Sequence, residues 1–136
     1  MIYLDEIGGL FGWITILFFG ATLLNFILKF INKKFSKQIA QNQSIKPIFS
    51  FLTKLFVRYH RVWGLLTVIT LITHFLIQFN TFGVSISGGA AASILFTQVF
   101  LGLYGTYKAK NRKGIWFVSH RFISILLILA IFVHLM

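Results

Sequence analysis

Residues 60–74 read HRVWGLLTVITLITH, and residues 120–134 read HRFISILLILAIFVH. Each stretch begins and ends with histidine, and together they contain all 4 histidines of the chain. The residues between the histidines are mostly apolar, which is typical of a membrane-spanning helix. In an α-helix the two histidines of a stretch share one face and lie about 21 Å apart along the axis. Each helix is therefore expected to carry one histidine near either membrane surface.

The composition of the whole chain agrees with a membrane protein. Of 136 residues, 57% are hydrophobic and 11% are charged, and 17 are Phe, which is far from the usual range of soluble proteins. Four apolar stretches are long enough to cross a bilayer as helices. They lie at about 8–31, 60–79, 89–107 and 116–136.

We therefore expect a single all-α domain over residues 1–136, folded as a bundle of four transmembrane helices. A polar segment, 32–46, follows the first span. It leads into an amphipathic segment at about 47–58, which Pro47 opens. Proline suits the first turn of a helix, so we expect this segment to lie as a helix on the cytoplasmic membrane surface.

The charged residues predict the orientation in the membrane. The net charge is +11, and every Lys and Arg lies within 29–61 or 108–121, the segments that join the first span to the second and the third to the fourth. The positive-inside rule places both segments in the cytoplasm and both termini outside, in a multi-pass protein of the plasma or inner membrane. Topology thus explains the basic charge, and we expect membrane lipid rather than nucleic acid as a partner.

The second and fourth spans then run in the same direction, so His60 is level with His120, and His74 is level with His134. Two facing imidazoles are suited to axial ligation of one heme iron. Two pairs would hold two stacked b hemes without covalent attachment, since the chain has no Cys. A zinc or copper site would need three or four ligands at one depth. Interhelical hydrogen bonding and proton relay remain alternatives, but neither explains the repeated spacing.

Small residues share the helix faces of these histidines. Gly64 follows His60 by four positions, and Ser124 follows His120 by four, which would give room for a flat macrocycle beside each ligand. In the third span, Gly102 and Gly105 offer the same room. Ordinary close packing of helices explains these two glycines equally well.

Two cations adjoin the cytoplasmic-side histidines. Arg61 and Arg121 are suited to charge-assisted hydrogen bonds with heme propionates, although simple snorkelling at the membrane interface explains them as well. No Lys or Arg lies on the outer side. Uncompensated negative charge favours ferric iron, so we expect the outer heme to have the lower reduction potential.

The complete pattern consists, in the second span, of His60, Arg61, Gly64 and His74, and, in the fourth, of Ser119, His120, Arg121, Ser124 and His134. It resembles the ferric reductase-like transmembrane domain shared with NADPH oxidases, and more loosely the diheme core of cytochrome b. The resemblance implies an inner heme b on His60 and His120 and an outer heme b on His74 and His134. Members of the first family usually have six spans and often a cytoplasmic flavin and nicotinamide domain. This chain has four apolar stretches and no Gly-rich dinucleotide motif.

The expected function is transfer of electrons across the membrane, from a cytoplasmic-side or quinol donor to an outer-face acceptor. Donor and acceptor would be separate proteins or a quinone. The sequence does not distinguish a ferric reductase from a quinone reductase. Asn25 and Gln98 are candidates for quinone contact, although such amides more often join helices. A heme-bearing anchor for a peripheral dehydrogenase and a non-enzymatic heme or metal carrier or sensor are the alternatives. A homodimer would bury faces that four helices leave exposed.

Overall fold

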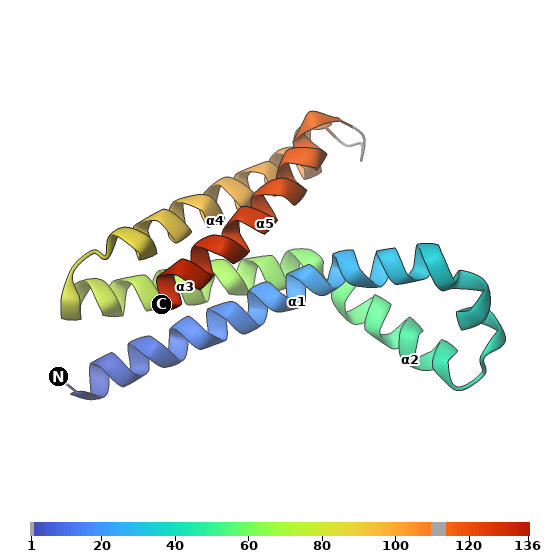
Figure 1. The fold of residues 1–136 in the computed structure, drawn as a ribbon, viewed down its shortest axis with the longest axis horizontal. Coiled ribbons are helices and arrows are strands. Elements are labelled where there is room, and N and C mark those ends of the chain that lie inside the picture. Colours follow the sequence, from blue (N-terminus) through green and yellow to red (C-terminus); the bar gives the residue numbers. More distant parts are fainter. Residues whose placement is uncertain (1, 110–113) are drawn as a thin grey trace. The chain divides into compact units, whose positions relative to one another are not determined.

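The chain is almost entirely helical, which confirms the all-α prediction (Figure 1). The structure is a computed structural model that describes residues 2–109 and 114–136, and no strand occurs among these residues. The helices form two compact units, Met1–Thr81 and Phe82–Met136.

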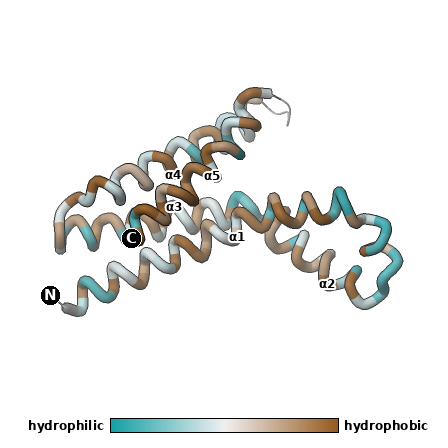
Figure 2. The backbone as a smooth tube through the Cα atoms, viewed as in Figure 1, coloured by the Kyte–Doolittle hydropathy of each residue, from teal (hydrophilic) through white to brown (hydrophobic). Residues whose placement is uncertain are grey.

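The first unit begins with a long helix, α1 (Ile2–Gln41), which departs from helical geometry at Phe35 (φ −121°, ψ 21°). Its first part is apolar, and its distal part is hydrophilic (Figure 2). No Gly or Pro occurs between Gly20 and Pro47, and the distal part is rich in Lys and Gln, which are good helix formers. The polar segment predicted at 32–46 is therefore largely a continuation of the first helix.

A short helical arm follows α1 and folds back along it (Figure 1). The arm consists of α2 (Ile45–Leu52) and a π-helix, η1 (Thr53–Arg58). The Oδ1 atom of Asn42 accepts hydrogen bonds from the backbone N–H groups of Ser44 and Ile45, both at 3.0 Å, and so satisfies donors at the start of α2. The amphipathic segment is helical, as predicted, but it packs against the distal part of α1. Its place on the membrane surface stays a prediction.

Trp63 joins the arm to the next helix, α3 (His60–Phe82). The indole N–H of Trp63 donates to the backbone oxygen of Leu55 in η1 at 3.0 Å. The same ring stacks on Phe56 of η1, with centroids 5.8 Å apart, and lies 5.9 Å from the ring of Phe18 in α1. One aromatic side chain therefore connects α1, η1 and the beginning of α3.

The second unit is a helical hairpin of α4 (Ile86–Tyr104), which continues as the π-helix η2 (Gly105–Ala109), and α5 (Ile115–Leu135). Ser85 caps α4, since its hydroxyl accepts from the N–H of Gly88 at 3.1 Å. A Cβ atom at Gly105 would overlap the ring of Trp116. Gly105 therefore permits the close approach of η2 and α5.

Within the described part of the chain, four helices are long and apolar enough to cross a membrane, as predicted. The candidate spans are Tyr3–Gln41, His60–Phe82, Ile86–Ala109 and Ile115–Leu135. The apolar side chains that are buried among the described residues are few: Phe19, Ala21, Leu28, Ala91, Leu95 and Leu127. Most other large apolar side chains are exposed. This distribution fits helices that are solvated by lipid.

Candidate ligand histidines

His74 lies on α3 and reaches α1 within the first unit. Its Nδ1 atom is 2.8 Å from the backbone oxygen of Gly8. Its ring also lies against Gly12, because a Cβ atom built there would be 3.1 Å from Cε1 of His74. A carbonyl oxygen can only accept, so Nδ1 carries the hydrogen. In the neutral ring, Nε2 then holds the lone pair.

His120 makes the corresponding contact in the second unit, from α5 to α4. Its Nδ1 atom is 3.1 Å from the backbone oxygen of Gln98, so Nδ1 again donates. A Cβ atom at Gly102, one turn further along α4, would be 3.3 Å from Cε1 of His120. Both His74 and His120 thus pair Nδ1 with a backbone carbonyl of a neighbouring helix and rest on a glycine of that helix.

The side chain of Gln98 also faces His120. Its Nε2 atom is 3.3 Å from Nε2 of His120 and contacts the hydroxyl of Ser124. An amide N–H is a donor, which agrees with a lone pair on His120 Nε2. The Ser124 hydroxyl donates in turn to the backbone oxygen of His120 at 2.9 Å. Gln98 therefore joins α4 to α5 by hydrogen bonds. This is the interhelical role that the sequence indicates as the alternative to quinone contact.

His134, near the end of α5, lies against the beginning of α4. Its Nδ1 atom is 3.2 Å from the hydroxyl oxygen of Ser87. A Cβ atom at Gly88 would be 3.0 Å from Cε1 of His134. The glycine contact seen at the other two histidines is therefore repeated here, with a hydroxyl in place of the carbonyl.

His60 is the first residue of α3 and is half-buried. A Cβ atom at Gly64 would meet no atom within 4 Å, so close packing does not require a glycine at this position. The two glycines of the third span differ from Gly64, because Gly102 contacts His120 and Gly105 contacts Trp116. For these two, close helix packing is the role that the contacts show.

The two cations predicted at the site, Arg61 and Arg121, are both exposed. The guanidinium carbon of Arg121 lies 4.2 Å from the ring centroid of Phe117, one turn earlier on α5, a cation–π contact. Pairing of either arginine with a propionate stays a prediction. Asn25 of α1, the other amide considered for quinone contact, has a buried Oδ1 atom with no hydrogen-bond partner among the described residues.

The structure thus places His60 and His74 on one helix of the first unit, and His120 and His134 on one helix of the second. Facing of the histidines from the two units stays a prediction. No group of three or more His, Cys, Asp or Glu side chains that could hold a metal ion occurs within residues 2–109 and 114–136.

Sequence reasoning missed the residues that hold the rings. These are Gly8 and Gly12 on α1 and Ser87, Gly88 and the backbone of Gln98 on α4. A signal was present for the first two, since Gly8 and Gly12 form a small-xxx-small pattern that is typical of close helix contact. The backbone acceptors have no sequence signal, because every residue carries a carbonyl.

Comparison of this chain with family models, with curated proteins and with solved structures finds no match. The geometry of the histidines and the arrangement of charge along the sequence are therefore the basis of the functional proposal.

Proposed function

We propose that the chain is a membrane-embedded diheme b-type cytochrome that carries electrons from one membrane face to the other. In this proposal His60 and His120 hold one heme, and His74 and His134 hold the second. The observation that supports it best is the position of the hydrogen on the imidazole rings of His74 and His120. Each donates from Nδ1 to a backbone carbonyl, so that the lone pair is on Nε2, the nitrogen that would ligate the iron.

The residues around each ring would act as its support. A ligating histidine usually donates its other ring N–H to an acceptor, which fixes the tautomer and the ring plane and raises the basicity of the ligating nitrogen. The backbone oxygen atoms of Gly8 and Gln98 are such acceptors. At His120, ligation through Nε2 would require the amide of Gln98 to release its contact with that atom. When bound, each heme would supply a one-electron change at iron in a low-dielectric sheath.

The distribution of Lys and Arg supports one orientation of the chain in the membrane. With the basic segments in the cytoplasm, His60 and His120 lie at the cytoplasmic side, next to Arg61 and Arg121. Electrons would then pass between a cytoplasmic-side or quinol donor and an acceptor at the outer face. Both reactants would be separate from this chain, as in a ferric or quinone reductase that relies on a partner for its reductant.

Transport of electrons into closed vesicles tests the proposal. Purified protein is loaded with heme, reconstituted into phosphatidylcholine vesicles that enclose ferricyanide, and exposed to dithionite outside. Each electron lost by external dithionite should reduce one trapped ferricyanide to ferrocyanide, which is followed by its absorbance. We expect reduction at a rate well above that of protein-free vesicles.

His74→Ala should abolish this transfer, because a conduit needs both hemes. Thr73→Ala is the matched control, since the Thr73 hydroxyl bonds to the backbone oxygen of Ile69 in its own helix, and it should leave the rate unchanged. Protein that binds heme but reduces no trapped ferricyanide would refute the conduit and favour a heme carrier or sensor.

A further inference from the structure

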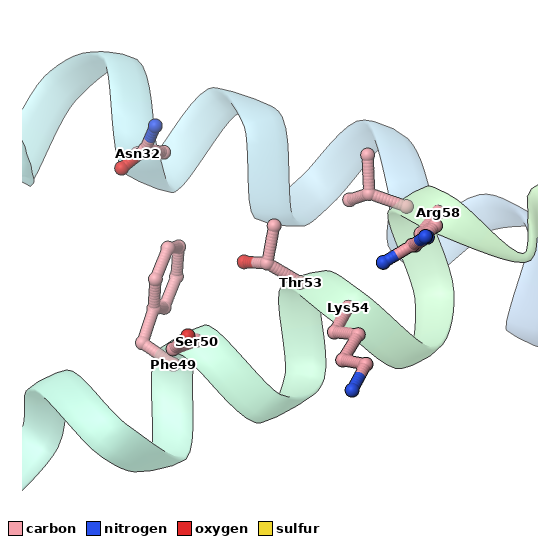
Figure 3. Close-up of a pocket in the computed structure, with 7 residues that line it drawn as sticks. Asn32, Phe49, Ser50, Thr53, Lys54 and Arg58 are labelled. Atoms are coloured by element: carbon pink, nitrogen blue, oxygen red, sulfur yellow. The ribbon is translucent and has the colours of Figure 1, made fainter.

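A shallow cavity of about 480 Å³, wide open on one side, lies between the distal part of α1 and the arm formed by α2 and η1 (Figure 3). Its polar lining residues are all uncharged or basic. They are Asn32, Ser50, Thr53, Lys54 and Arg58. The cavity belongs to the first unit alone and contains none of the four histidines.

Thr53 lines this cavity, and its hydroxyl lacks a hydrogen-bond partner among the described residues. Its Oγ1 atom is buried and has no hydrogen-bond partner among residues 2–109 and 114–136, a situation that costs free energy unless another group satisfies it. Figure 3 shows the Thr53 side chain directed into the space between the two helical segments, on the side where Asn32 of α1 lies. A bound group that accepts hydrogen bonds would satisfy this hydroxyl.

The charges around the cavity select an anion. Lys54 and Arg58 both line it, and the only acids of the chain are Asp5 and Glu6. Those acids are about 39 Å from Asn32 along the axis of α1. With no Asp or Glu side chain of the first unit near enough to neutralise the two cations, they are available to an anionic ligand with several oxygen atoms.

The local backbone supports a built site. Thr53, Lys54 and Arg58 all belong to η1, a π-helix. Such π-helical turns are rare and frequently occur at functional sites. Here Thr53, Lys54 and Arg58 of the same turn all line one cavity.

We propose that this cavity binds the phosphate group of an anionic phospholipid. The apolar surroundings favour a lipid over a free anion, because Phe49 and Val57 complete the lining, and Ile48 and Phe51 on the same arm are 62% and 63% exposed. The arm ends at Arg58, immediately before the apolar helix α3 that starts at His60. Phosphate groups of a bilayer lie at this level of a spanning helix, with acyl chains available to the exposed apolar side chains.

Native mass spectrometry of the full chain in detergent tests the proposal. Phosphatidylglycerol and phosphatidylcholine are titrated in parallel, and bound lipid is counted. We expect one phosphatidylglycerol to bind at least roughly tenfold more tightly than phosphatidylcholine. Thr53→Val keeps the charge and shape but removes the hydroxyl, and should weaken phosphatidylglycerol binding by roughly tenfold. Thr73→Val, at a hydroxyl bonded within its own helix, should have no effect.

The charge of the site is tested by two matched double variants. Lys54→Gln with Arg58→Gln should weaken phosphatidylglycerol binding by at least roughly tenfold. Lys33→Gln with Lys37→Gln removes the same charge from exposed positions of α1 outside the cavity lining and should change it by less than about threefold. Equal losses in the two doubles, with Thr53→Val unaffected, would overturn the proposal in favour of diffuse attraction. Displacement of the lipid by millimolar inorganic phosphate would overturn it in favour of a soluble phosphate ligand.

Discussion

Replacing Gly12 by Val tests the contact between α1 and His74. A Cβ atom at Gly12 would lie 3.1 Å from Cε1 and 3.2 Å from Nδ1 of His74, and the two methyl groups of valine extend further. The ring must then move and lose its 2.8 Å hydrogen bond to the backbone oxygen of Gly8. Overpacking of this kind costs about 1–3 kcal/mol, and the lost hydrogen bond about 1 kcal/mol. We expect a total destabilisation of about 3 kcal/mol.

The matched control for this change is Gly9→Val. A Cβ atom at Gly9 meets no atom within 4 Å, and both variants exchange the same residues on the same helix, so that effects of helix propensity cancel. Helix content during unfolding in mixed detergent micelles measures the stability of both proteins. Heme content, measured in parallel, should fall by about one per chain in Gly12→Val alone. Equal stability of the two variants would refute the packing of His74 on α1.

Three further changes test the other parts of the site. Gln98→Leu removes the amide that faces Nε2 of His120 but keeps the backbone oxygen that accepts from Nδ1. We expect the free energy of unfolding of the heme-free protein, measured as above, to fall by about 1 kcal/mol. Heme affinity should stay equal or rise, because the amide no longer competes for Nε2. Gly64→Phe should not destabilise the heme-free protein, because a Cβ atom there meets no atom within 4 Å and Phe favours a helix more than Gly does. It should lower the extracted heme by about one per chain, and unchanged heme content would contradict a heme beside His60. Arg61→Gln combined with Arg121→Gln should lower the higher of the two midpoint potentials in a redox titration, since negative propionates would lose their cations; a shift of the lower midpoint alone would contradict this assignment.

The helices could be predicted from the sequence because each depends on local composition. All four apolar stretches form helices, and apart from Met136 their residues lie in candidate spans. The bounds were less accurate. The first helix continues to Gln41 instead of ending near residue 31, because no Gly or Pro stops it. The connection between the spans expected at 60–79 and 89–107 is shorter than those bounds imply, since α3 continues to Phe82 and α4 already begins at Ile86. Gly83 lies in this connection, and its φ of +79° suits glycine.

The supports of the histidines depend on tertiary packing and could not be predicted in the same way. The spacing of His60, His74, His120 and His134 predicts which face of each helix they share, but not which backbone carbonyl their rings meet. Gly102 is an example, because a glycine in a span can give room either to a heme macrocycle or to a side chain of a neighbouring helix. Only the contact with His120 shows that the second role applies.

A heme count on the purified protein tests most directly whether the chain binds two b hemes. The protein is produced in cells supplied with heme and purified in detergent. Absorbance spectra are recorded before and after reduction with dithionite, and heme is quantified after acid–acetone extraction. We expect a b-type spectrum and about two extractable hemes per chain. His134→Ala should retain about one heme, and Val133→Ala, at a neighbouring position that is 63% exposed, should retain both. Wild-type protein without a heme spectrum would refute the proposal that the chain is a diheme cytochrome.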